Sequence, residues 1–172
     1  MRLDKDGRWL QKVRRVISPN CDARPDGTAI DLIVIHGISL PPCRYGGPYI
    51  DQLFTNTLKP AEHPYFAEIA GQRVSSHLLI GRKGDITQYV PFHLRAWHAG
   101  ESTFERRTAC NDFSIGIELE GCDEQPYDRI QYEVAAQAVN ALMQRWPEIT
   151  PRRVVGHCHI APGRKTDPGP AF

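Results

Sequence analysis

The stretch Ile30-Asp31-Leu32-Ile33-Val34-Ile35-His36 is a nearly unbroken run of β-branched and other apolar residues that ends in a polar one. Such residues favour strands, and an unbroken run, in contrast to an alternating one, predicts a central strand that is buried on both faces. His36 closes the run and Gly37 follows it. Because α/β folds place their chemistry where a buried strand ends, His36 is the first candidate functional residue.

The remaining elements predict an α/β (α+β) fold in which a mixed sheet is flanked by helices. The helix expected over 128–145 begins with a capping box, Asp128 followed by Gln131, and ends before Pro147. The other expected elements are a short helix or edge segment at 8–17, a helix at 48–57, a long loop at 59–72 that could act as a lid, a hairpin of strands 74–80 and 86–90, a strand at 114–120 and a last strand at 152–156.

Composition and charge describe an ordinary globular chain. With 172 residues, 41% of them hydrophobic, one domain over residues 1–172 is expected. The net charge is only +1 and the basic residues are scattered, which argues against a nucleic-acid-binding protein. No run approaches the roughly 18 apolar residues of a membrane span, and the N-terminus has no apolar stretch behind its charges, so a cytoplasmic protein is expected.

Five cysteines are present, an odd number without a Cys-x-x-Cys pair. This argues against a disulfide framework and against a thiolate zinc site. We therefore expect reduced thiols.

A second polar stretch, Gly156 to Gly169, crowds imidazoles, an ammonium and a carboxylate between prolines and glycines. These turn-forming residues disfavour a helix and predict an extended or turning backbone. Side chains alternate along such a backbone, which places Lys165 and Asp167 on the same side.

His36, His157 and Asp167 together make two imidazoles and one carboxylate, the ligand set of catalytic zinc sites that leave a fourth position open. The spacing alone is weak support, because histidines also serve as core or surface residues. His159 could compete with His157 for a metal, and Cys158 could be a nucleophile or a soft ligand.

Several longer runs resemble the AmpD family of cytoplasmic 1,6-anhydro-N-acetylmuramyl-L-alanine amidases of peptidoglycan recycling. These are zinc amidases that share a fold with peptidoglycan recognition proteins and phage T7 lysozyme. The runs are Ile35-His36-Gly37-Ile38-Ser39-Leu40-Pro41-Pro42, His63-Pro64-Tyr65-Phe66, Arg95-Ala96-Trp97-His98-Ala99-Gly100, Cys110 to Gly121, and Gly156 to Gly169.

The resemblance implies a role for each matching residue. Zinc is bound by His36, His157 and Asp167, which ranks His157 above His159. Protons are handled by Glu118, and Lys165 stabilises the oxyanion. Glu120 lies on the same strand face as Glu118, so the choice between these two glutamates depends on the resemblance alone.

The resemblance also implies the substrate and its surroundings. The bond cut is the amide between the lactyl group of N-acetylmuramic acid and L-alanine of the stem peptide. Substrate contacts are implied for Arg73 and Tyr65, with Ala96 and Trp97 on the pocket wall. In the family, loss of the activity lets the muropeptide that signals β-lactamase induction accumulate. No nucleic-acid or membrane partner is implied, and a monomer is expected.

Two other functions stay open at this point. A non-catalytic peptidoglycan-binding module of the recognition-protein class would lack part of the catalytic set, which this sequence has in full. A cysteine hydrolase using Cys158 would remain active in a strong chelator. His77, inside an apolar strand, is expected to be structural. The chain departs from the family at Gly37, where Asn is usual, and at Ala109, where Arg sometimes occurs.

Overall fold

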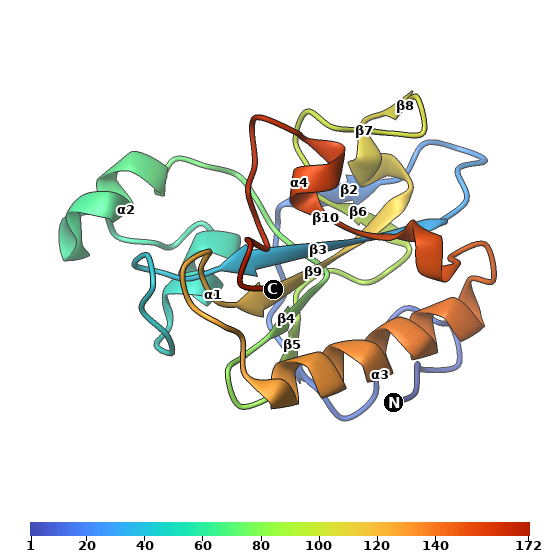
Figure 1. Ribbon diagram of the computed structural model, residues 1–172, viewed down its shortest axis with the longest axis horizontal. Coiled ribbons are helices and arrows are strands. Elements are labelled where there is room, and N and C mark those ends of the chain that lie inside the picture. Colours follow the sequence, from blue (N-terminus) through green and yellow to red (C-terminus); the bar gives the residue numbers. More distant parts are fainter.

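A six-stranded mixed sheet forms the centre of the computed structural model, which describes residues 1–172 (Figure 1). Its strand order is β1-β5-β4-β9-β3-β10, and only the β4–β5 pair is antiparallel. The strands are β1 (Arg14–Arg15), β3 (Leu32–Ile38), β4 (Leu78–Ile80), β5 (Ile86–Gln88), β9 (Ser114–Glu120) and β10 (Val154–Gly156). The expected mixed sheet with flanking helices is confirmed.

The two faces of β3 are both buried, as its apolar sequence predicts. Ile33 and Ile35 pack in the cluster that includes residues of α3 (Arg129–Arg145), which lies along one face of the sheet (Figure 1). Leu32 and Val34 pack on the opposite face, in a separate cluster with Ile160. His36 follows these two at the strand period of two, so it lies on the face away from α3.

The long helix begins and ends close to the expected limits. Gln131 accepts a hydrogen bond at 3.0 Å from the backbone N–H of Asp128, the N-cap residue, which confirms the reaching-back half of the capping box. The Nε2 of Gln131 also donates to the backbone carbonyls of Ile80 and Glu120. These bonds join the first turn of α3 to the ends of β4 and β9.

The face away from α3 is covered by smaller elements (Figure 1). Two antiparallel pairs lie there, β2 (Cys21–Ala23) with β6 (Leu94–Ala96), and β7 (Thr103–Phe104) with β8 (Arg107–Thr108). A 3₁₀ turn, η2 (Cys110–Asp112), leads into β9. None of the helices is long and apolar enough to cross a membrane.

At the end of the molecule beyond β3, the structure differs from two of the predicted elements. The helix expected at 48–57 is only α1 (Tyr49–Phe54), because the Phe54 carbonyl is taken by Ser18 Oγ and Asn20 Nδ2 from a distant segment. The prediction of a loop over 59–72 is wrong. This segment contains the turn η1 (Pro60–Glu62) and the helix α2 (Pro64–Ile69), whose N-cap His63 accepts from Tyr65 N at 3.1 Å.

The shorter strands are confirmed in type and corrected in length. The hairpin over 74–80 and 86–90 forms only at β4 and β5, and residues 74–77 are not a strand. The segment 8–17 contains the edge strand β1 and no helix. The last strand, β10, is preceded by the turn η3 (Pro151–Arg153).

The stretch after β10 corrects another prediction. Residues His157–Ile160 form one helical turn, α4, where an extended or turning backbone was expected. The prolines begin only at Pro162, so they end this turn and do not prevent it. The backbone N–H of Gly156 donates to His159 Nδ1 at 3.0 Å, which stabilises the start of the turn.

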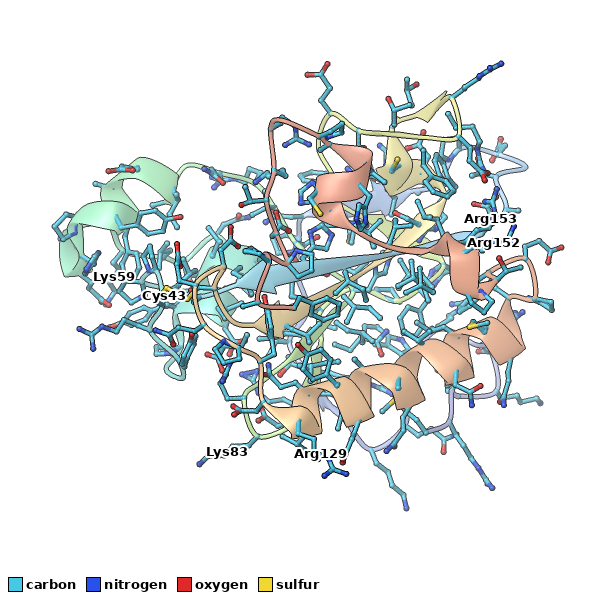
Figure 2. All side chains as sticks on the ribbon, viewed as in Figure 1. Cys43, Lys59, Lys83, Arg129, Arg152 and Arg153 are labelled. Atoms are coloured by element: carbon cyan, nitrogen blue, oxygen red, sulfur yellow. A yellow bond between two sulfur atoms is a disulfide. The ribbon has the colours of Figure 1, made fainter.

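The prediction that all cysteines are reduced is wrong for one pair. Cys43 and Cys122 form a disulfide with a Cα–Cα distance of 5.4 Å, and Cys21, Cys110 and Cys158 are free. Cys43 lies at the end of the molecule that carries α1 and α2 (Figure 2). Adjacent parallel strands β3 and β9 deliver the two cysteines to the same edge of the sheet, a proximity that residue spacing does not reveal.

Candidate active site

An open cleft of about 550 Å³ lies where β3 and β9 end, a size in the usual range for small-molecule sites. His36 near the end of β3 and Glu118 of β9 line it, and these two residues are direct partners in the strand register. The segment 164–167, which follows α4, forms another part of the wall. Three distant parts of the chain therefore meet at this cleft.

The three predicted metal ligands converge on one small volume. The Nδ1 atoms of His36 and His157 lie 3.0 Å apart. Asp167 Oδ2 lies 3.1 Å from the first nitrogen and 3.0 Å from the second. Atoms about 3 Å apart can all be about 2 Å from one ion, which is the usual ligand distance to zinc.

The hydrogen bonds of the two imidazoles leave the converging nitrogens free. His157 Nε2 is 3.1 Å from the carbonyl oxygen of Ala99, which can only accept, so this nitrogen carries the proton of the neutral ring. His36 Nε2 is 2.9 Å from His98 Nδ1. Burial lowers the pKa of His36 to about 4, so this ring is neutral at neutral pH. Two bare nitrogens and a carboxylate repel one another unless a cation lies between them, so the donor set fits a divalent metal.

Asp167 is held in place by its backbone. Its carbonyl accepts from Cys158 N at 3.0 Å, and the next carbonyl, that of Pro168, accepts from the Tyr127 hydroxyl at 2.8 Å. The first bond ties the segment to the turn that carries His157, and the second ties it to the residue just before the N-cap of α3. Lys165, two residues earlier, is exposed at the surface and lines the cleft together with Asp167.

Glu118 is almost fully buried beside this cluster, and its Oε2 has no hydrogen-bond partner. Burial, followed by the charge of Asp167, raises the pKa of Glu118 well above its ordinary value, while Lys165 acts in the opposite direction. A mostly buried carboxyl group that lines a cleft can bind a water or a substrate group and exchange a proton with it.

Glu120 has a different environment, although it shares the strand face of Glu118. Its Oε1 accepts from Gly46 N at 2.5 Å, and its Oε2 from Arg82 N at 3.3 Å. Glu120 does not line the cleft. Both oxygens therefore hold loops in place, which distinguishes the two glutamates that the sequence pattern left equivalent.

The four predicted substrate-contact residues lie in different places. Tyr65 and Trp97 line the cleft, and Trp97 Nε1 donates to Asp22 Oδ1 at 3.1 Å. Arg73 is exposed and does not line the cleft, although both of its neighbours in the chain do. Ala96 has no exposed surface and packs in the apolar cluster beneath α1 and α2, because its side chain faces the core and not the cleft.

The remaining histidine and cysteine candidates lie outside the ligand cluster. His77 accepts from Gly116 N at 3.0 Å, lies 3.1 Å from the Leu94 carbonyl, and has its pKa lowered to about 3 by burial, as a structural histidine would. His159 is exposed and accepts from the backbone at the start of α4. Cys158 does not line the cleft and lies instead against a separate apolar groove beside α3, which removes the geometric basis for a cysteine nucleophile.

Sequence reasoning missed the residues around the ligands. His98 contacts His36, and its Nε2 lies 3.2 Å from Ser114 Oγ. Asn111 Oδ1 accepts from the backbone N–H groups of His98 and Ala99. His98 and Asn111 both occur in the runs that resemble the amidases, but no periodicity or spacing indicates what they contact.

Gly37, one of the departures from the family pattern, has a local explanation. A Cβ atom there would lie 2.2 Å from the hydroxyl oxygen of Tyr127, so any side chain requires Tyr127 to move. Ala109 adopts a left-handed φ of 57° before η2, and nothing in the structure explains the absence of an arginine at this position.

Comparison with known proteins gives a consistent result. The sequence model of the family described as N-acetylmuramoyl-L-alanine amidase (Amidase_2) matches residues 26–170. The 1,6-anhydro-N-acetylmuramyl-L-alanine amidase AmpD of Citrobacter freundii is 58% identical over 167 residues, which make up 97% of this chain and 89% of that protein.

Solved structures agree. A crystal structure of a selenomethionine derivative of AmpD matches with a TM-score of 0.96 at 57% identity, over 100% of this chain and 94% of that one. The AmiD amidase of E. coli, solved in complex with anhydro-N-acetylmuramic acid-L-Ala-D-γ-Glu-L-Lys, matches with a TM-score of 0.59 at 28% identity, over 99% of this chain and 62% of that one. The chain therefore belongs to the N-acetylmuramoyl-L-alanine amidase family of enzymes.

Proposed function

We propose that this chain, as a single domain over residues 1–172, is a zinc amidase that hydrolyses the bond between the lactyl group of 1,6-anhydro-N-acetylmuramic acid and L-alanine. It does so in cytoplasmic peptidoglycan recycling, as a monomer. The observation that carries the proposal is the meeting of His36, His157 and Asp167, within 3.1 Å of one another, next to a buried glutamate with a free oxygen.

Nδ1 of each histidine and the Asp167 carboxylate would hold the metal. When bound, zinc supplies a Lewis acid and lowers the pKa of water, which makes hydroxide available near neutral pH. The chain supports this choice of metal with two nitrogen ligands and one oxygen ligand, a set typical of catalytic zinc, and without a thiolate at the cluster.

Glu118 carries the proton. Its carboxyl group, which lines the cleft, accepts a proton from the attacking water and then gives it to the amine of the departing L-alanine. Burial shifts the pKa of Glu118 upwards, towards neutral pH. A carboxyl group whose pKa is near the working pH can both accept and donate a proton. Burial therefore prepares this glutamate for both halves of the reaction.

Lys165 stabilises the charge that develops on the carbonyl oxygen. Two observations support this role: Lys165 lines the same cleft as Glu118, and it is only two residues from Asp167 in the chain. Such a donor acts on the oxyanion more strongly than on the ground-state carbonyl, which lowers the barrier.

The substrate class is taken from the relatives. The C. freundii relative is named for the 1,6-anhydro-N-acetylmuramyl-L-alanine linkage, and AmiD was solved with an anhydromuramyl tripeptide. In the cleft of this chain, Tyr65 and Trp97 present aromatic surface to the substrate. Arg73, which is exposed between two residues that line the cleft, offers its guanidinium to the carboxylates of the stem peptide.

The test is a hydrolysis assay with purified protein. 1,6-Anhydro-N-acetylmuramyl-tripeptide and intact sacculi are incubated with protein that has been treated with a chelator, and then with protein to which Zn²⁺ is restored. We expect release of the tripeptide only with Zn²⁺, and faster turnover of the anhydromuropeptide. Activity that survives complete removal of metal would contradict the assignment.

The second candidate, a non-catalytic peptidoglycan-binding module, makes a different prediction in the same assay. A zinc-loaded binding module would retain anhydromuropeptide in equilibrium dialysis without releasing tripeptide. The complete set of Glu118, Lys165 and three ligands favours the enzyme.

A further inference from the structure

We propose that Asn111 and His98 are positioning residues that fix the tautomers of both zinc histidines before the metal binds. Asn111 holds two neighbouring hydrogen-bond acceptors in place, the His98 ring and the Ala99 carbonyl. The His98 ring accepts from Nε2–H of His36, and the Ala99 carbonyl accepts from Nε2–H of His157. The inference rests on the zinc site of the proposed function and goes beyond it, because it assigns a role to the Arg95–Gly100 and Cys110–Asp112 runs.

The first step is the anchoring of the backbone at 98 and 99. Asn111 Oδ1 accepts from His98 N at 3.1 Å and from Ala99 N at 2.8 Å. One amide oxygen therefore fixes two consecutive peptide groups. It also links them to η2, the turn that precedes β9.

The second step concerns His157. The Ala99 carbonyl oxygen lies 3.1 Å from His157 Nε2, and it also accepts from Arg164 Nη2 at 2.7 Å. A carbonyl oxygen has two lone pairs and no proton, so it holds the Nε2–H tautomer of His157. The Nδ1 of that ring then has a lone pair for the metal.

The third step concerns His36 and is a directional chain of hydrogen bonds. Ser114 Oγ donates to the Cys110 carbonyl at 2.6 Å, so its oxygen is free to accept from His98 Nε2–H at 3.2 Å. With Nε2 protonated, the neutral His98 ring has a bare Nδ1, which accepts from His36 Nε2–H at 2.9 Å. The chain ends at a carbonyl, and reversing it would place a proton on His36 Nδ1, the metal ligand.

The position of the His98 ring also depends on β9. A Cβ atom at Gly116 would lie 2.6 Å from His98 Cγ, so the ring packs directly against the backbone of the strand. Ser114 is two residues earlier on the same strand face. This packing therefore places its hydroxyl oxygen where it can accept a hydrogen bond from His98 Nε2–H. One acceptor of this chain of hydrogen bonds, Ser114, thus belongs to β9, the strand that carries Glu118.

The consequence is a site whose ligand atoms are bare before the metal arrives. A histidine that must change tautomer, or whose N–H has no acceptor, binds metal more weakly, and loss of such a partner typically costs about 10–100-fold in affinity. Removing Asn111 releases both acceptors at once. Removing Ser114 affects only the His36 branch.

The first experiment measures the Zn²⁺ dissociation constant of the full chain by competition with a chromophoric chelator. We expect Asn111→Leu to bind Zn²⁺ about 10–100-fold more weakly than the unaltered chain, and Asn111→Asp, which keeps an acceptor oxygen, to stay within about threefold. Asn140→Leu is the matched control, because Asn140 is exposed on α3 and the same change there is expected to leave the affinity unchanged.

The second experiment reads the tautomers directly by ¹⁵N NMR of the histidine rings in the unaltered protein, first with a chelator and then with Zn²⁺, and it does not depend on how a variant folds. We expect His98 to be protonated at Nε2 and bare at Nδ1. A His98 protonated at Nδ1, or an Asn111→Leu variant that is folded and binds Zn²⁺ as tightly as the unaltered chain, would overturn the inference. Failure of the unaltered chain to bind Zn²⁺ at all would instead overturn the proposed function beneath it.

Discussion

The replacement Glu118→Gln tests the proposed chemistry most directly. Gln has almost the same shape as Glu but cannot accept a proton from the attacking water. A positioned general acid–base group contributes about 10²- to 10⁴-fold to a rate, which corresponds to about 3–5 kcal/mol of barrier. Because Oε2 of Glu118 has no hydrogen-bond partner in the protein, the replacement breaks no internal contact of that oxygen. We therefore expect kcat to fall by this factor while zinc content stays the same.

The stability of the Glu118→Gln variant should not fall together with kcat. Burial raises the pKa of Glu118, which means that the folded protein disfavours the ionised form. A neutral amide avoids this penalty, so the metal-free variant should be at least as stable as the unaltered protein at neutral pH. Thermal unfolding with a chelator present measures this.

Glu120→Gln is the matched control, because Glu120 is on the same strand and the same face. Its two oxygens accept from the backbone N–H groups of Gly46 and Arg82. Weakening these bonds should lower stability by about 1–3 kcal/mol and change kcat little. The assay follows release of tripeptide from 1,6-anhydro-N-acetylmuramyl-tripeptide, with zinc measured in every sample. A zinc-loaded Glu118→Gln protein that keeps kcat within about threefold would refute the assigned role.

Three further predictions concern the metal, the disulfide and a buried histidine. Asp167→Asn removes the only anionic ligand and should weaken Zn²⁺ binding more than about 100-fold, whereas Asp123→Asn, a change in the same cleft that leaves the ligand cluster intact, should not, as measured by chelator competition. The Cys43–Cys122 disulfide closes a loop across 79 positions, and the chain-entropy relation gives a stabilisation of up to about 4.5 kcal/mol. Cys43→Ser should lower the unfolding free energy by up to that amount and should abolish the response to reductant. Reductant should destabilise the unaltered protein, and it should equally destabilise Cys158→Ser, which removes only a free thiol. Burial lowers the pKa of His77 from 6.5 to about 3. Between these two values the unfolded chain binds a proton at His77 and the folded chain does not, so the folded state loses stability as the pH falls below 6.5. His77→Gln should remove about 2 kcal/mol of the loss between pH 7 and pH 5 in urea unfolding with chelator, and His93→Gln, at an exposed site, should remove much less.

The sequence predicted the central strands and α3 well because their signals are local and strong. An apolar run such as 32–35 has to be buried wherever it lies, and a capping box defines the start of a helix by its own atoms. The short elements were predicted less well. The end of α1 depends on Ser18 and Asn20, and the pairing of Cys43 with Cys122 depends on which strands are adjacent. These are tertiary contacts, and no local pattern carries them.

The candidate site divides in the same way. The three metal-ligand candidates could be named from residue type and resemblance, since few side chains can bind zinc. The roles of His98 and Asn111 could not be predicted in this way. The Nδ1 of His98 contacts His36, and Asn111 accepts from backbone N–H groups. Any residue with an acceptor atom can make such hydrogen bonds, so the residue type alone does not indicate this role. Ala96 shows the converse error, since resemblance placed it on a pocket wall and the structure packs it in the core.

The register of β3 against β9 explains why the cluster and the proton carrier occur together. His36 is paired with Glu118, and adjacent strands lie about 4.8 Å apart, so this pairing places the carboxyl group beside the ligand cluster without any loop to position it. On the other face, Ile35 and Ile117 are also paired and pack against the α3 side of the core. A slip of one residue would place Leu119 beside His36 and turn Glu118 towards the apolar core, where its charge would be uncompensated. The hydrophobic core therefore selects the same register that the chemistry requires, and substitutions at Ile115, Ile117 or Leu119 should impair the site through this register even though none of these side chains faces the cleft.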